Sequence, residues 1–572
     1  RKGSSSTGEE ILSGDDVASA SAAYNETEGW VVQLKFNSDG ASAFAAATTE
    51  LAANNGTISI WLDDSNISTA TVNEAITGGE AIIKGNFDQD SASTLANQIN
   101  SGSLPFALSA ESYSTISPSL GAKSLDVMVQ AGIIAFILVA LMMIFRYRLP
   151  GTIAVISLMG QVAATLAVVS GYFSVFPGST LTLPGIAGII LAIGMGVDAN
   201  VITAERIKEE LKNGKSLDGA LKSGFARGLT PIIDGNVTIV IVAIVLMGAF
   251  GPSDGLFAKA LHFVFFAFGP STAGTIYAFG YTLLTGVLLN FVFGVFATRV
   301  MIRGAASIKA LRNPWLYGAA KLGKDETEKK QVNFVGLRKK FLVFSSCLMA
   351  AIVLCAVVFG VHLDTEFTGG AMITLSYDGS FEMAQVQQTA SDALENTGLT
   401  LQTGENVATG DQTLKISMPG TETVTTDQVE ALLDSLNETY PDNNFAQLSL
   451  SNVSAAMGTK FLQKSLVAVV FALVLILLYI ALRFKNIGGL TGGMMAVLAL
   501  VNDLMVVFGT FVLLRTPLDG NFIAAMLTIL GYSINDTVVV YDRIRENRAL
   551  MGKKASFEEL VNRCLLYTSP SP

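Results

Sequence analysis

The 572-residue sequence has few of the residues that build catalytic and metal sites in soluble proteins. It contains three cysteines and two histidines, which excludes a disulfide scaffold, and neither type shows a metal-ligand spacing. Only 15% of the residues are charged and 50% are hydrophobic, which excludes a disordered chain and argues against an ordinary soluble enzyme. No GxxxxGK[ST] string and no nucleophile–base pair is present, so ATP hydrolysis is unsupported. We expect no enzyme, no cofactor and no metal.

Long hydrophobic runs are abundant instead. A helix that crosses a membrane needs about 20 mostly apolar residues. Nine stretches qualify: 127–145, 152–173, 182–204, 231–250, 275–300, 341–361, 465–482, 489–514 and 521–541. A tenth, Leu261–Phe268, is too short to span and is predicted to be interfacial or re-entrant. The sequence therefore predicts a polytopic α-helical membrane protein.

Acidic and basic residues lie in different parts of the sequence. Residues 1–126 carry 5 Lys or Arg against 16 Asp or Glu, and residues 362–464 carry 3 against 14. The linker 303–340 is basic, and so are the short loops at 146–148, 483–485 and 543–554. Short loops rich in Lys and Arg stay in the cytoplasm. With nine spans, this rule places both acidic regions outside the membrane and every basic loop inside.

The sequence patterns of the two acidic regions predict α+β domains. Residues 362–464 predict strands at 371–377, 399–405, 412–418 and 445–451 and helices at 381–396 and 426–439. This β-α-β-β-α-β order is the ferredoxin-like unit. Residues 1–126 predict strands at 30–36 and 57–62 and helices at 40–53 and 91–100. A related ferredoxin-like α+β fold is expected there.

Two membrane segments repeat each other. GMGVDANVITAERIKEE (194–210) and GYSINDTVVVYDRIREN (531–547) align at a constant offset of 337, which pairs Gly194 with Gly531, Arg206 with Arg543 and Glu209 with Glu546. Asp198 falls on Asn535, the neighbour of Asp536. Each copy follows an acidic extramembrane region. A transporter built from two related helix bundles gives this pattern.

Asp198 and Asp536 are the first candidates for chemistry. Each stands near the end of an apolar span, where a carboxylate is costly and usually functional. A low dielectric disfavours the charged form, so each group could carry a proton in a proton-coupled device. The alternative is a purely structural carboxylate that holds two helices in register through a neighbouring Thr, Asn or Arg.

Five further residues are candidates for a structural or functional role. Asp234 follows Pro231 and is interpreted as a helix-capping residue. Asp503 lies deeper in its span and remains an auxiliary candidate. Arg227 is a candidate counter-charge for Asp198, or a surface arginine that reaches the interface. Arg206 and Arg543 are expected to anchor helix ends.

These residues also carry a family resemblance. Leu181–Leu211 resembles the signature helix of SecD, and 76–88, Ser101–Ser109 and Ile116–Leu125 resemble the end of its large domain. EFTGGAMITL (366–375) and MLTILGYSINDTVVVYDRIREN (526–547) resemble SecF. Together they resemble the fused SecDF form of the SecD/SecF protein-export family over most of 25–563.

The resemblance implies a twelve-span protein of the RND superfamily in the bacterial inner membrane. It implies use of the proton-motive force to pull or release preproteins emerging from the SecYEG channel after SecA has pushed them in, with YajC and YidC as further partners. The family's proton-path carboxylates match Asp198 and Asp536, and Na⁺ is the alternative coupling ion. Unfolded preproteins and lipids, not nucleic acid, would be bound.

The expected domains follow from both arguments. They are an incomplete first extracytoplasmic domain (1–126), a five-span SecD-like bundle (127–302), the linker (303–340), a SecF-like span (341–361), a second extracytoplasmic domain (362–464) and a three-span SecF-like bundle (465–563). Against the family pattern we interpret the chain as truncated at both ends, without its first span, its last two spans and an arginine partner of the second Asp. The tail 564–572 is interpreted as non-native, and Gly251–Ser271 as a longer insert than usual.

Two other functions stay open at this stage. An RND-type exporter of small molecules or lipids would need larger outer domains than these. A non-transporting scaffold that recruits partners to the channel would leave both carboxylates dispensable.

Overall fold

The computed structural model forms two units, Arg1–Ala110 and Glu111–Pro572. It describes residues 2, 8–25, 29–62, 65–101, 112–116, 118–173, 178–179, 182–269, 274–318, 333–394, 396, 398–405, 410–419, 424–485, 488–551 and 556–567. The middle of the basic linker (319–332), most of Ser101–Ser109, the end of the Gly251–Ser271 insert and the tail after 567 therefore lie outside the described residues.

The first unit is an α+β domain, as predicted. Its elements are η1 (Gly14–Asp16), β1 (Val17–Asn25), β2 (Gly29–Phe36), α1 (Ser38–Ala52), β3 (Thr57–Leu62), β4 (Ser65–Thr71), β5 (Glu80–Phe87) and α2 (Gln89–Ser101). β1, β2 and β5 form an antiparallel sheet in that order, and β3 pairs with β4. The core lies between this sheet and the helices, where Val32 and Ile83 pack with Phe44 and Leu95.

The order of elements in this unit corrects one detail of the prediction. Two strands precede α1 and three lie between the helices, so the unit does not have the expected ferredoxin-like β-α-β-β-α-β order. β1 escaped prediction because its sequence, VASASAAYN, is rich in Ala and Ser, which carry little strand propensity. β4 and β5 were also missed, although the inward residues Ala81 and Ile83 of β5 are buried.

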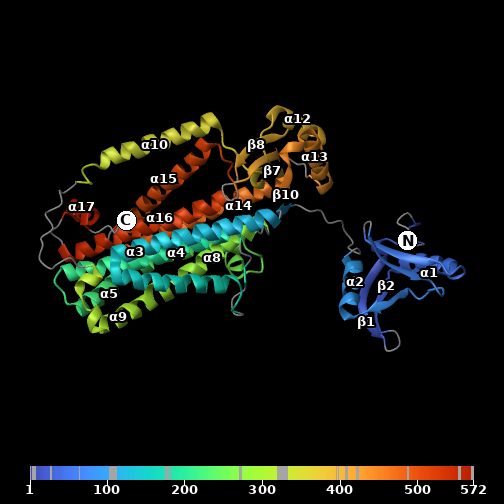
Figure 1. Ribbon diagram of the computed structural model, residues 1–572, viewed down its shortest axis with the longest axis horizontal. Helices are drawn as coiled ribbons and strands as arrows, with labels where there is room; N and C mark the ends of the chain where they lie inside the picture. Colours follow the sequence, from blue (N-terminus) through green and yellow to red (C-terminus); the bar gives the residue numbers. More distant parts are fainter. Residues whose placement is uncertain are drawn as a thin grey trace. The chain divides into compact units, whose positions relative to one another are not determined.

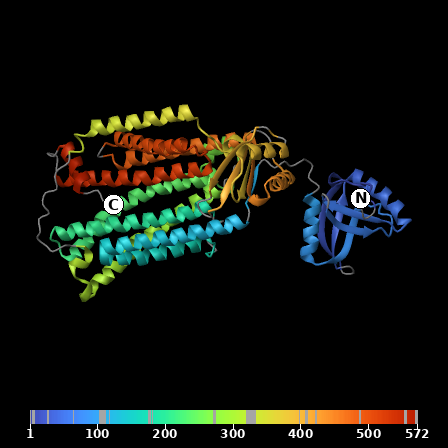
Figure 2. The same ribbon diagram turned by 45° about the horizontal axis from the view of Figure 1, so that its top comes forward.

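The second unit contains the membrane helices (Figure 1). Eight helices among the described residues are long and apolar enough to cross a membrane. They are α3 (Pro118–Val169), α4 (Leu183–Lys212), α5 (Leu217–Phe250), α8 (Gly274–Asn290) continued through η3 (Phe291–Ala297) and α9 (Thr298–Ser307), α10 (Arg338–Phe359), α14 (Ala455–Arg483), α15 (Leu490–Leu514) and α16 (Gly520–Met551). α10 lies at the edge of the bundle and packs on α15 (Figure 2).

Nine predicted runs fall in these eight helices because α3 is interrupted. Arg148 in α3 has a φ of 53° and a ψ of −118°, which is not helical. The apolar part of α3, Leu125–Val169, has 45 residues. A straight helix of that length would measure about 68 Å, over twice the about 30 Å of a bilayer core. The kink therefore divides α3 into the two predicted spans 127–145 and 152–173.

The short patch Leu261–Phe268 does not span, as predicted. It forms part of three short turns, α6 (Leu256–Ala260), α7 (His262–Phe265) and η2 (Phe266–Phe268). The buried Phe265 packs against Phe471 of α14, with ring centroids 6.3 Å apart. Beyond α9 the described part of the linker holds η4 (Lys309–Leu311) and η5 (Pro314–Tyr317).

The second extramembrane domain confirms the predicted ferredoxin-like unit. It comprises β7 (Gly370–Tyr377), α12 (Met383–Ala393), β8 (Thr400–Glu405), β9 (Gln412–Pro419), α13 (Thr426–Thr439), η6 (Pro441–Asn443) and β10 (Ala446–Val453). The sheet has a fifth strand that was not predicted, β6 (Ser112–Ile116), and its order is β6-β10-β7-β9-β8. β6 pairs antiparallel with β10, Ile116 opposite Ser449 and Ser112 opposite Val453.

A short helix joins this domain to the bundle. α11 (Thr365–Thr368) begins at Asp364, whose side chain accepts the backbone N–H of Glu366. The Glu366 carboxylate accepts the N–H of Gly520, the first residue of α16, at 2.7 Å. Phe367 stacks on Phe461 of α14, with ring centroids 5.5 Å apart. The domain is therefore held on two helices of the second bundle. We call this the domain end of the bundle, and the opposite end, which carries the described linker residues, the linker end.

Candidate ion pathway between the two repeats

The two repeated segments meet in the bundle. The first copy lies on α4 and the second on α16, and α5 packs against both helices. Small residues allow the close approach: Gly531 of α16 lies against Ile239 of α5, and the Thr238 hydroxyl donates to the Gly531 carbonyl at 3.3 Å. Close packing through glycine is common between membrane helices. The candidate carboxylates therefore lie at the boundary between the two halves.

Asp198 is linked to the other half by a hydrogen bond. The Tyr532 hydroxyl on α16 donates to Asp198 Oδ2 at 2.8 Å, and both side chains are half-buried. A tyrosine in an apolar helix seeks a partner for its hydroxyl. Tyr532 was not predicted as a site residue, although a polar-tipped ring one turn before Asp536 was the available signal. The pair can hold or pass a proton between α4 and α16.

Asp536 lies one helical turn after Tyr532, on the same face of α16. It is exposed in this structure, whereas Asp198 is half-buried. Tyr532 thus connects the two main candidates, since it donates to Asp198 and lies one turn before Asp536.

The auxiliary candidate Asp503 joins the same helix from α15. The Ser533 hydroxyl donates to Asp503 Oδ2 at 2.5 Å. Ser533 lies three residues before Asp536. Asp503 is therefore placed next to the pathway, in contact with the helix that carries Asp536.

The capping interpretation of Asp234 is wrong. α5 continues through Pro231, so Asp234 lies in the middle of a helix and not at its start. Asp234 is 3% exposed, and its Oδ1 atom accepts from Arg483 Nε at 2.8 Å and from the Tyr479 hydroxyl at 3.1 Å. Both partners lie on α14. Asp234 therefore forms a buried ion pair between the two halves.

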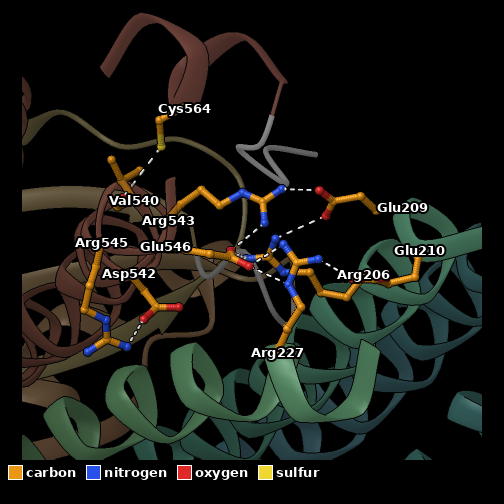
Figure 3. Close-up of polar contacts among 10 residues, drawn as sticks. All are labelled: Arg206, Glu209, Glu210, Arg227, Val540, Asp542, Arg543, Arg545, Glu546 and Cys564. Atoms are coloured by element: carbon orange, nitrogen blue, oxygen red, sulfur yellow. Dashed lines mark hydrogen bonds and ion pairs between the residues drawn. The ribbon is translucent and has the colours of Figure 1, made fainter. Parts of the chain in front are cut away.

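Arg227 is not the counter-charge of Asp198. Its guanidinium binds Glu210 of α4 and Glu546 of α16 (Figure 3). It leaves α5 one turn before Pro231, a position that directs it to the linker end. A buried glutamate on α4, Glu210 at 1% exposure, takes the arginine because a charge removed from water needs a partner.

Arg206 and Arg543 do more than anchor helix ends. They form a closed ring with Glu209 and Glu546 at the linker end of α4 and α16 (Figure 3). Both arginines are nearly buried, at 8% and 4% exposure. The sequence repeat gave the identities of all four residues, but not that the two copies touch.

The repeat also extends beyond the predicted strings. At the same offset of 337, Arg146 corresponds to Arg483, outside those strings, and within them Glu205 corresponds to Asp542. Arg146 pairs with Glu205 at 3.1 Å, whereas Arg483 pairs with Asp234. The two halves therefore place equivalent arginines in different pairings. Among the described residues, no three His, Cys, Asp or Glu side chains form a metal-binding group.

Comparison with known proteins agrees with this architecture. The family "Protein export membrane protein SecD/SecF, C-terminal" matches residues 98–297 and 432–569, and "SecDF, P1 head subdomain" matches 4–106. The protein translocase subunit SecDF of Bacillus subtilis is 31% identical over 517 residues, covering 88% of this chain and 64% of its own. The subunit of the same name in Brucella abortus is 27% identical and is covered over 65% of its length.

A solved structure shows the same fold. The crystal structure of SecDF, a translocon-associated membrane protein from Thermus thermophilus, matches with a TM-score of 0.71 and 29% identity, over 98% of this chain and 70% of that one. The chain spans somewhat less than two thirds of the length of the two curated relatives. The matched segments contain both repeat copies and the first domain. This multi-pass membrane chain belongs to the SecD/SecF family of protein export membrane proteins.

Proposed function

We propose that this chain is an accessory subunit of the Sec protein translocase that uses the proton-motive force to drive late preprotein translocation and release on the outer side of the membrane. The observation that carries this proposal is the Asp198–Tyr532 hydrogen bond between the two repeats, with Asp536 one turn away. A carboxylate that changes charge at this boundary would favour one packing of α4 against α16 over another.

The extramembrane domains would do the mechanical work. The ferredoxin-like domain rests on α16 through the bond between Glu366 and Gly520, so a movement of α16 reaches that domain directly. The first unit, matched to a P1 head subdomain, would hold the emerging chain. The expected clients are unfolded preproteins.

Location and partners complete the proposal. The acidic domains would face outward and the basic linker inward, in the inner membrane of a bacterium, because Lys- and Arg-rich short loops stay in the cytoplasm. The partners would be the SecYEG channel and SecA, with YajC and YidC as further candidates. H⁺ is the proposed coupling ion and Na⁺ the alternative.

The test uses Asp198→Asn and Asp536→Asn in vesicles that contain the translocase and a preprotein arrested late in transfer. Both variants should lose release that depends on an imposed proton gradient, while ATP-driven entry continues. Asp254→Asn, an exposed change in a loop at the domain end, is the matched control and should behave as the native chain. Replacing the proton gradient by a sodium gradient identifies the coupling ion. Proton-dependent release that persists in both site variants would refute the proposal.

A further inference from the structure

The ring at the linker end has an unusual pairing pattern. Arg206 contacts Glu209 on its own helix at 3.2 Å and Glu546 on α16 at 3.2 Å. Arg543 contacts Glu546 on its own helix at 2.7 Å and Glu209 on α4 at 2.7 Å. Each arginine thus has one partner three residues along its own helix and one partner on the other half. Figure 3 shows the four side chains converging between the two helices.

Because of this pattern, α4 and α16 can separate at the ring with a low cost in free energy. Breaking a buried ion pair normally leaves an uncompensated charge, which is strongly destabilising. Here one pair within each helix, Arg206–Glu209 on α4 and Arg543–Glu546 on α16, can persist when the two helices move apart. Only the two bonds between helices are lost. The ring therefore has a closed arrangement and an open one, and every charge is paired in both.

The ring lies between the carboxylates and the linker end. Arg206 follows Asp198 by eight residues and Arg543 follows Asp536 by seven, which is about 10–12 Å along a helix. Between them an apolar layer fills the boundary, where Val539 of α16 packs against Ala199, Ile202 and Ile232. The ring and this layer therefore lie between Asp198 and the linker end.

Arg227 adds a bias toward the closed arrangement. It binds Glu210 on α4 and Glu546 on α16, so Glu546 has three arginine partners while the ring is closed. If α16 moved away, Arg227 would keep Glu210. The closed ring is thus favoured in this structure, and on opening Arg227 loses Glu546 but stays paired with Glu210.

We propose that Arg206, Glu209, Arg543 and Glu546 form a reversible clasp that positions the two repeats and controls access of water from the linker end to Asp198. The clasp opens when its two inter-helix bonds give way and the two bonds within helices remain. The proposal rests on the proposed function only for the use made of this access, and access can be measured without any translocation.

Two charge exchanges separate the arrangements. Glu209→Arg with Arg543→Glu keeps both inter-helix pairs attractive but places like charges three residues apart on each helix, so it favours the closed clasp. Arg206→Glu with Glu209→Arg keeps both pairs within helices but makes both inter-helix pairs repulsive, so it favours the open clasp. The two variants carry the same number of charges of each sign, so each is the control for the other.

The readout is a single reporter cysteine, Val539→Cys, in a chain whose three native cysteines are replaced by alanine. A membrane-impermeant maleimide is added from the linker side of vesicles, and Trp315→Cys, exposed in the linker, confirms the side. We expect Val539→Cys to react at least about tenfold faster in the open-clasp variant than in the closed-clasp variant, since about 1.4 kcal/mol shifts an equilibrium tenfold, with the native chain between them. Equal rates in the two variants, or the reverse order, would overturn the clasp.

A milder variant guards against misfolding. Arg206→Lys with Arg543→Lys keeps both charges but removes the planar fork that binds two carboxylates at once, so labelling should be faster than in the native chain. The clasp is rejected if Val539→Cys is labelled at the native rate in this milder variant. If the two charge-exchange variants are labelled at different rates as expected, but Asp198→Asn and Asp536→Asn retain proton-dependent release, the proposed function fails and the clasp stands. If Asp198→Asn and Asp536→Asn lose proton-dependent release but the two charge exchanges are labelled at the same rate, the clasp fails and the proposed function stands.

Discussion

The Tyr532 hydroxyl lies 2.8 Å from Asp198 Oδ2 and joins the two repeats across their boundary. A hydrogen bond to a charged group contributes about 1.5–3 kcal/mol. Tyr532→Phe removes the bond but keeps the ring, so we expect proton-dependent preprotein release to fall about 10- to 100-fold, as such an energy implies. Release assayed in vesicles with an imposed proton gradient checks this.

Tyr541 on the same helix supplies the control for that change. Its hydroxyl donates to the backbone carbonyl of Gly492 at 2.9 Å and does not bind a carboxylate. Tyr541→Phe should leave release within about twofold of the native rate, a change below about 0.5 kcal/mol. Equal losses in the two variants would mean that the Asp198 bond has no special role.

The Asp234–Arg483 pair should matter for stability. Arg483→Met leaves Asp234 buried with only the Tyr479 hydroxyl. Removal of one partner of a buried pair costs about 3–5 kcal/mol, and because the Arg483 side chain is 34% exposed we expect about 2–4 kcal/mol. Thermal unfolding in detergent measures the loss. The control is Arg312→Met, whose pair with Asp218 is largely exposed and should contribute less than about 1 kcal/mol. Similar losses in both variants would contradict the prediction.

The junction at Glu366 should depend on pH. Burial, together with the charges of Asp519 and Asp364, raises the pKa of Glu366 to about 7 from its ordinary value of 4.5, although the N–H of Gly520 opposes the shift. Burial also raises the pKa of Asp364, against the nearby charge of Lys415. The folded junction therefore binds the proton more tightly than the unfolded chain, and its stabilisation is complete below pH 4.5 and is lost as pH rises through about 7.

The corresponding measurement is the unfolding temperature of the chain between pH 6 and pH 8. We expect it to fall as the pH rises, and the fall to shrink in Glu366→Gln, which cannot ionise. Glu430→Gln, on the exposed face of α13, should keep the native pH dependence. An unchanged dependence in Glu366→Gln would show that another group is responsible.

Gly235 should tolerate no side chain. A Cβ at this position of α5 would lie 1.6 Å from Asn535 Oδ1 on α16, so Gly235→Ala must displace Asn535 or part the helices. Overpacking of this kind costs about 1–3 kcal/mol. A Cβ on Gly194 of α4 would meet nothing within 4 Å, so Gly194→Ala should be neutral or stabilising by up to about 1 kcal/mol. Unfolding temperatures that do not separate these two alanine variants would refute the described packing of α5 on α16.

Local sequence patterns predicted most of the helices and strands of this molecule. The contacts between side chains that are remote in the sequence could not be predicted. The apolar runs gave all the membrane helices, and the alternation around Ile373 and Leu414, both fully buried, gave the ferredoxin-like strands. The repeat gave Asp198 and Asp536 as a related pair. Nothing in the spacing showed that Asp234 faces Arg483, 249 positions away, because ion pairs between helices depend on how the bundle closes.

The same limit explains the missed strand and the misplaced arginine. β6 has only five residues, Ser112–Ile116, and it pairs with β10, more than 300 residues later. Arg227 was considered as a counter-charge for Asp198 or as a surface arginine, but it pairs with Glu210 of α4 and Glu546 of α16. Both errors concern contacts between segments that are remote in the chain.

The pairing of β6 with β10 has a consequence for how the protein can be divided. The sheet of the second domain borrows its outermost strand from the segment that precedes the first membrane helix. If the two halves were produced as separate polypeptides, the backbone N–H and C=O groups along one edge of β10 would be unpaired in the second half. An uncovered strand edge promotes aggregation. Such a half would need its companion to supply Ser112–Ile116 as a donated strand before its five-stranded sheet could be complete.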